Sequence, residues 1–245
     1  MKYKLFLSSI LTLFSFSANA DLLSLEVGTG QWDHKASGQF QYVVGGVGDN
    51  LNLESDLGLE DEKEGYTYAI LRHAVPLIPN VKVMTSSLMH QGSGASSFDF
   101  GGTTYTNPVN TKFVLDHTDI TAFWNLLDTG LTFDLGLTAR QVDGEVSVDD
   151  GVIKTSSLVD GTIPMLYAGI SISPIDSLRL SFEANYLGSG DTAITDTIAK
   201  ITYVTAFNLG IEAGVRDMSI ELDDQDGNFS NMDFSGTFVG LSFKF

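Results

Sequence analysis

Apolar and polar residues alternate one by one along most of this chain, which is the period of a β-strand. The most regular stretch runs from Leu131 to Arg140. Its two sides are Leu131, Phe133, Leu135, Leu137 and Ala139 against Thr132, Asp134, Gly136, Thr138 and Arg140. No run after residue 20 reaches the ~18 consecutive apolar residues of a membrane helix. The pattern therefore predicts an all-β protein whose strands each have one apolar face.

Strand-like segments are predicted at residues 22–32, 66–75, 81–90, 113–124, 131–140, 166–172, 178–186, 199–205, 209–216 and 233–245. Short turns are expected at 76–80, 126–130, 174–177 and 206–208, and long polar loops at 33–64, 91–110, 142–161, 188–196 and 223–232. These connections give ten strands. Eight remain possible if weaker segments merge, and twelve if residues 33–64 hold two more. Gln39 to Val44 and Leu51 to Leu53 are candidates to extend the wall above a membrane.

Strands with one apolar face need a partner for that face, and lipid is the partner that fits here. In lipid every backbone group must be paired internally, so only helices or a closed barrel span it. With no helical segment available, we predict a transmembrane antiparallel up-and-down β-barrel with both termini periplasmic. Short turns then lie at the periplasmic rim and long acidic loops outside the cell.

The last stretch, Asp233 to Phe245, alternates to the final residue, with Phe245, Phe243 and Leu241 on its apolar side. It resembles the C-terminal strand of bacterial outer-membrane β-barrel proteins, whose terminal aromatic residue is read by the barrel-assembly machinery. The whole chain resembles the small Gram-negative outer-membrane barrels, the broad group with OmpA-type and OmpW-type members. The resemblance implies a monomeric, non-enzymatic surface protein in the cell outer membrane, delivered by periplasmic chaperones and surrounded by lipid and lipopolysaccharide.

The N-terminal residues 1–20 have the features of a secretory signal peptide. Lys2 and Lys4 precede an apolar region from Leu5 to Phe16, and Ala18-Asn19-Ala20 is a small-residue cleavage site. We expect residues 21–245 to form one barrel domain. The chain contains no cysteine, so it has neither a disulfide nor a lipidated N-terminus.

Charge narrows the possible partners. The formal net charge is −18, and loss of residues 1–20 with their two lysines makes it −20. Nucleic-acid binding needs basic surface and is not expected. The acidic loops could share divalent cations with lipopolysaccharide phosphates.

If the apolar faces meet lipid, the opposite faces point charged residues of both signs into the lumen. These are Glu26, Lys82, Asp119, Asp134, Arg140, Arg179, Glu183, Lys200, Glu212, Arg216 and Lys244. Small barrels fill their interior with side chains, which favours a plug of ion pairs. A narrow channel for small hydrophilic solutes is the alternative.

No residue pattern specifies catalysis, a cofactor or a metal. Asp116, His117 and Asp119 lie near the exterior end of one strand, as the Asp and His pairs of omptin proteases do, but only His117 and Asp119 share a face. A polar interior pair is favoured over a hydrolase site. His34, His73 and His90 lack metal-ligand spacing, no Gly-x-Ser-x-Gly motif is present, and residues 223–228 do not match an EF-hand. Two interfacial aromatic girdles are expected, with Trp32, Tyr66, Tyr68 and Tyr186 outside and Trp124, Phe207, Phe243 and Phe245 at the periplasmic side.

Overall fold

The computed structural model describes residues 23–75, 77–94, 97–190, 192–223 and 228–245. The expected signal peptide therefore lies outside the described residues. The strands are β1 Leu23–Gln41, β2 Asn50–Asn52, β3 Glu62–His73, β4 Asn80–Ser86, β5 Met89–Gly94, β6 Phe98–Phe100, β7 Thr103–Tyr105, β8 Val109–Asp128, β9 Leu131–Asp149, β10 Lys154–Ile175, β11 Leu178–Ser189, β12 Thr192–Val204, β13 Leu209–Asp223 and β14 Phe229–Lys244. No helix within these described ranges is long and apolar enough to cross a membrane.

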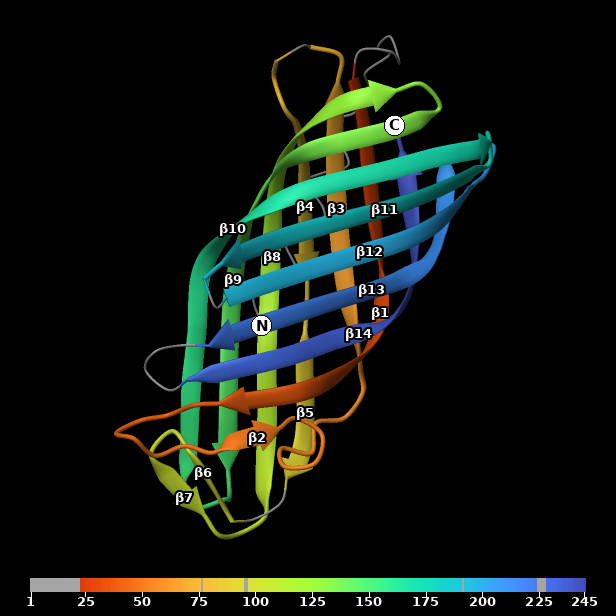
Figure 1. The fold of residues 1–245 in the computed structure, drawn as a ribbon. Helices are drawn as coiled ribbons and strands as arrows, with labels where there is room; N and C mark the ends of the chain where they lie inside the picture. The colour runs from red at the N-terminus through yellow and green to blue at the C-terminus, as the bar shows by residue number, and fades with distance from the viewer. Residues whose placement is uncertain (1–22, 76, 95–96, 191, 224–227) are drawn as a thin grey trace, which may run out of the picture.

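Ten strands form a closed antiparallel barrel in which chain neighbours pair and β14 returns to pair with β1. β2, β5, β6 and β7 are additional strands, and β5 prolongs the wall beyond β4 by pairing with β8. Figure 1 shows the C-terminus and the short turns at one end, and β2, β5, β6 and β7 at the other. By the rule for such barrels we call these the periplasmic and the extracellular end. The predicted ten-stranded up-and-down barrel is confirmed.

Outward side chains in the periplasmic half of the wall are large, apolar and exposed. They include Leu71, Val83, Ile120, Leu137, Leu166, Ile170, Phe182, Ile201, Ile211, Val215, Val239 and Leu241. Their neighbours along the same strands, such as Asp134, Thr138 and Arg140 on β9, are buried inside. Exposing so much apolar surface to water is unfavourable by ~25 cal/mol per Å². This band is therefore the part of the wall that lipid covers.

The polarity of the alternation inverts above the lipid-facing band. Asp116, Asp143 and Asp160 lie directly opposite one another on β8, β9 and β10 and mark the change. Beyond this row of aspartates, Val146 and Val148 continue the inward phase of Arg140 and are buried, whereas the alternate positions are polar. Here water covers the outside of the wall and an apolar core fills the inside. The residues still alternate one by one, but the apolar ones now point inward and the polar ones outward.

This inversion overturns two predicted loops. Residues 142–161 belong to β9 and β10, apart from a tight turn between Asp149 and Lys154, and β11 and β12 run through most of 188–196. The predicted loops 33–64 and 91–110 also contain wall, because β1 continues to Gln41 and β5 to Gly94. Extension of the wall at residues 39–44 and 51–53 is confirmed in part by β1 and β2. In the predicted loop 223–232, residues 224–227 lie outside the described residues.

A compact apolar cap closes the extracellular mouth. Its buried members are Leu51, Leu53, Leu57, Leu59, Leu88, Phe98, Phe100, Tyr105, Val109, Phe113, Val148 and Phe234. The segment after β2 is fixed by a hydrogen bond from Leu53 N to Gly38 O of 3.0 Å and by a bridge between Leu59 and Gly92. The β6–β7 hairpin is held by Tyr105 Oη, which donates to Val148 O at 3.0 Å. The mouth is thus sealed by the chain itself.

Three aromatic residues expected in the exterior girdle lie inside the barrel instead. Trp32, Tyr66 and Tyr68 are buried, and Tyr186 is exposed. The tyrosine rings fit because glycines face them. A Cβ on Gly28 would lie 2.4 Å from the Tyr68 ring, and one on Gly240 would lie 2.5 Å from Tyr66 Oη. Trp124, Phe207, Phe243 and Phe245 are exposed at the periplasmic end.

Candidate functional site: the charged lumen

Six basic and six acidic side chains pair with one another inside the barrel. The pairs are Arg72–Asp134, Lys82–Glu183, Arg140–Asp119, Arg140–Asp196, Arg179–Glu26, Lys200–Glu212 and Arg216–Asp196. We call these twelve residues the lumen network. Four of the seven pairs join strands that are not neighbours in the wall, so these four cross the interior. The network as a whole carries no net charge.

The periplasmic layer of the network consists of two arginine–carboxylate pairs. Arg179 donates two hydrogen bonds to Glu26, from Nη1 to Oε2 at 3.0 Å and from Nη2 to Oε1 at 2.7 Å. Arg72 donates to Asp134 Oδ2 at 3.0 Å. A forked contact such as that of Arg179 with Glu26 is among the strongest protein hydrogen bonds. They close the interior just above the periplasmic opening.

Two lysine–glutamate pairs form the middle layer. Lys82 pairs with Glu183, and Lys200 donates to Glu212 Oε1 at 3.1 Å. Tyr68 Oη donates to the same Glu212 oxygen at 2.7 Å. The Lys200 ammonium also lies 4.7 Å from the centre of the Tyr68 ring, a cation–π contact.

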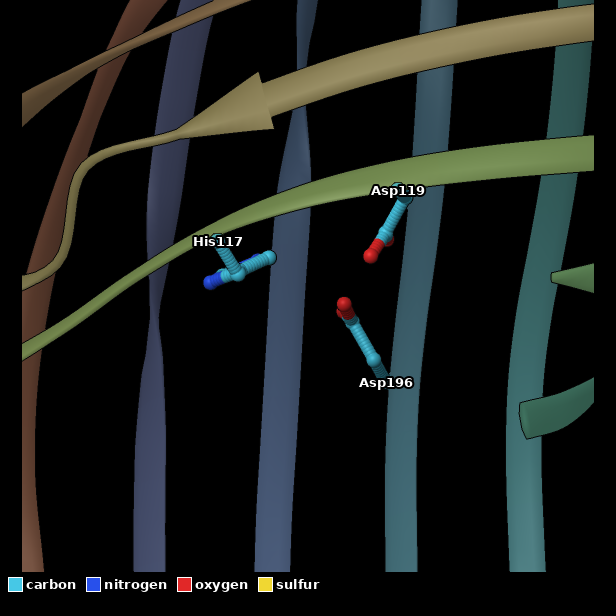
Figure 2. A group of neighbouring side chains, drawn as sticks. All are labelled: His117, Asp119 and Asp196. Atoms are coloured by element: carbon cyan, nitrogen blue, oxygen red, sulfur yellow. The ribbon is translucent and has the colours of Figure 1, made fainter. Parts of the chain in front are cut away.

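The upper layer joins two arginines to two aspartates and a histidine. Arg216 donates from Nε to Asp196 Oδ1 at 2.9 Å and from Nη2 to Asp196 Oδ2 at 2.7 Å. Arg140 contacts both Asp119 and Asp196. Figure 2 shows the carboxylates of Asp119 on β8 and Asp196 on β12 pointing toward each other, with His117 beside them.

His117, Asp119 and Asp196 are close enough to be considered as metal ligands, since one ligand atom of each lies within 4.8 Å of the others. Their bonding argues against that use. Arg216 Nη2 lies 3.0 Å from His117 Nε2 and donates to it, so His117 Nδ1–H donates to Leu115 O at 2.9 Å. A cation here would face two guanidinium groups. The same contacts leave no free base to activate a water, and all three residues are buried.

The structure brings together most of the residues singled out from sequence. Ten of the eleven predicted lumen charges belong to the lumen network, whereas Lys244 is exposed beside the periplasmic opening. Asp116 faces outward and accepts a hydrogen bond from Leu88 N at 2.9 Å. Sequence analysis missed Arg72 and Asp196. Arg72 shares its strand face with Tyr66 and Tyr68, which had been assigned to a girdle, and Asp196 fell in a predicted loop.

The space left among the ion pairs is small. Two cavities beside the lumen network offer about 30 Å³ and 50 Å³, and a single water needs ~10–15 Å³. A larger, open hollow of about 510 Å³ lies at the periplasmic end and is lined by Arg72, Arg179 and Lys244. It ends below the middle layer of the lumen network. This hollow is thus lined by arginines of the periplasmic layer and by no residue of the middle or upper layer.

A buried histidine pair lies between the lumen network and the apolar cap. His34 Nδ1 is 2.9 Å from His90 Nε2, and His90 Nδ1–H donates to Glu60 O at 2.7 Å. His90 Nε2 is then the acceptor and His34 Nδ1–H the donor. The bond from His90 to Glu60 ties the cap segment to the wall.

Comparison with known proteins supports the fold. The sequence matches no protein-family model and no curated protein. The outer-membrane protease OmpT of Escherichia coli is similar in structure, with a TM-score of 0.53 and 12% identity over 95% of this chain and 99% of that one. The translocator domain of the autotransporter NalP from Neisseria meningitidis has a TM-score of 0.43 and 15% identity, covering 94% and 90%. Ail of Yersinia pestis has a TM-score of 0.38 and 8% identity, covering 91% and 99%. The chain has the fold of the bacterial outer-membrane β-barrels.

Proposed function

We propose that this protein is a closed, non-enzymatic barrel of the bacterial outer membrane that serves as a structural or surface-interaction protein. The observation that carries this proposal is the distribution of charge. The chain has 31 acidic residues and 13 basic ones. The lumen network uses six of each, and Lys2 and Lys4 belong to the expected signal peptide. The remainder is 25 acidic against 5 basic residues, and Lys244 alone of these five is at the periplasmic end.

A pore would need an aqueous path with excess charge or polar walls along its length. Here the three layers of ion pairs and the apolar cap lie in series across the barrel axis. Barrels of this strand number have room for side chains but for little else. The acidic excess is therefore available outside, where it acts on partners and on nearby ions.

Insertion is proposed to depend on the aromatic end of β14. Phe245 N donates to Leu25 O at 2.8 Å, and the rings of Phe243 and Phe245 are 4.7 Å apart. Both side chains are exposed and remain accessible to the assembly machinery, as Leu241 does. Lipid and lipopolysaccharide are the expected permanent surroundings, and a monomer is the expected state.

Conductance in planar bilayers tests the closed lumen. The purified protein should insert without discrete openings, and a difference in gel mobility between heated and unheated samples should report that it is folded. Reproducible openings would favour the alternative, a narrow channel for small hydrophilic solutes. Membrane fractionation and surface labelling of intact cells test the location.

A further inference from the structure

One strand of the barrel has a free edge above the lipid-facing band. β10 pairs with β9 from Lys154 onward, but its pairing with β11 begins only at Leu166. Among the described residues, no backbone hydrogen bond is made on the β11 side of residues 156–164. An unpaired strand edge presents a row of N–H and C=O groups that a further strand can join.

Pro164 determines which residues present that row. In an antiparallel pair, alternate residues point both backbone groups toward the partner or away from it. Proline has no N–H and is tolerated where that position faces away from the ladder. Pro164 lies opposite Ala139 of β9, so its backbone groups point away from β9 and toward the free edge. Every second residue along β10 points its backbone the same way, which adds Thr162, Asp160, Leu158 and Ser156.

The side chains along this edge are exposed and of two kinds. Leu158 is 72% exposed, and Val152 at the hairpin turn is 86% exposed. Asp160 ends the row of aspartates that begins with Asp116 and Asp143. Like charges placed directly opposite on neighbouring strands repel. A cationic residue on a strand added beside β10 would stand opposite Asp160 and relieve that repulsion.

We propose that the edge of β10 from Ser156 to Thr162 is a docking site for an extended, cationic peptide segment that adds a strand to the barrel wall. Backbone pairing supplies the binding, as in other cases of strand addition. A basic residue of the segment pairs with Asp160, and an apolar one packs on Leu158. The proposal rests on the proposed surface-interaction role and names the class of partner.

The test uses a fluorescent peptide of about eight residues that alternates lysine with valine, a usual strand length, and the full-length protein in lipid nanodiscs. Binding is followed by anisotropy at several salt concentrations. A peptide with glutamate in place of lysine should not bind. The lysine peptide with N-methylated alternate amides keeps charge and apolar area but cannot pair, and we expect it to bind about tenfold or more weakly. Equal binding of the methylated and unmethylated peptides would overturn the proposal.

Variants of the protein provide a second arm. Leu158→Pro removes one edge N–H without touching the β9 ladder and should weaken binding by about tenfold. Asp160→Asn should weaken binding and reduce its salt dependence, whereas Asp233→Asn, an equal change of charge on β14, should not. If Asp233→Asn weakens binding as much as Asp160→Asn, the peptide binds the acidic surface in general and the edge site is wrong. Bilayer conductance is measured without peptide, so failure here leaves the closed-lumen proposal standing.

Discussion

Arg140 on β9 holds Asp119 on β8 in a forked ion pair, from Nε to Oδ1 and from Nη2 to Oδ2, both at 2.7 Å. The two residues lie opposite each other in the register of the strands, and Arg140 also reaches Asp196 on the far wall. Both partners of the fork are buried. A single guanidinium therefore fixes both the local strand pair and the packing across the lumen.

The first prediction concerns this residue. Arg140→Met leaves the carboxylate of Asp119 buried without its cation, and breaking a buried pair from one side costs about 3–5 kcal/mol. Asp196 retains Arg216 as its partner, so the loss of stability comes mainly from Asp119. We expect a lower urea midpoint for unfolding in detergent micelles, with the slope of the transition unchanged.

The matched control removes both charges of the fork. Arg140→Met combined with Asp119→Leu leaves no unpaired carboxylate at this pair, so it should recover part of the lost stability. A double variant as unstable as the sum of the single changes would show that the pair is not coupled.

The second prediction uses two glycines with different surroundings. Gly28→Ala places a methyl group 2.4 Å from the Tyr68 ring, which must move away from Glu212. Overpacking of this kind costs about 1–3 kcal/mol. Gly65→Ala is the control, because the nearest atom to its added Cβ is Gly30 O at 4.0 Å. Chemical unfolding should show a loss for the first variant and no loss for the second.

The third prediction is a dependence of the cap on pH. His34 lies between the outward charged residues Asp33 and Lys35, above the lipid-facing band. Burial lowers the pKa of His34 to about 4, with further lowering by His90 and Arg216. Burial also lowers the pKa of His90, although its bond to Glu60 O opposes the shift. Both rings are thus neutral in the folded protein at pH 7.

Because the pKa of His34 is lower in the folded protein than its ordinary value of 6.5, the unfolded chain binds more protons than the folded protein between these two values. Stability from the pair is therefore complete above about pH 6.5, falls as the pH drops, and levels off near the folded value of about 4 for His34. Limited proteolysis of residues 42–61 should accelerate over this window. His90→Asn should flatten the profile, whereas His73→Asn at the periplasmic end should not. An unchanged profile in His90→Asn would contradict this account.

The lipid-facing half of the barrel is predictable from sequence because the outward face meets lipid and the inward face is polar. Leu137 and Arg140 on β9 show that contrast. On the extracellular side of Asp143 the contrast reverses, with apolar side chains inside and polar ones outside. A search for strands with apolar outward faces therefore assigns these residues to a loop. Cross-lumen pairs such as Arg179–Glu26 join residues 153 positions apart. Their pairing depends on the shear of the closed barrel, which the strand period does not specify.

The last prediction separates assembly from stability at Phe245. Its side chain is more than half exposed, its ring lies 4.7 Å from that of Phe243, and Phe245 N donates to Leu25 O at 2.8 Å. Phe245→Ser keeps that bond and removes the ring contact with Phe243, so the stability of the barrel refolded in detergent should fall by only about 0.5–1.5 kcal/mol. In cells the same variant should lose most of its folded outer-membrane fraction, because the terminal ring is the proposed recognition signal. Phe207→Ser, at another exposed periplasmic ring, is the control and should leave the fraction unchanged. If both variants accumulate normally in the membrane, the terminal aromatic residue has no special role in this chain.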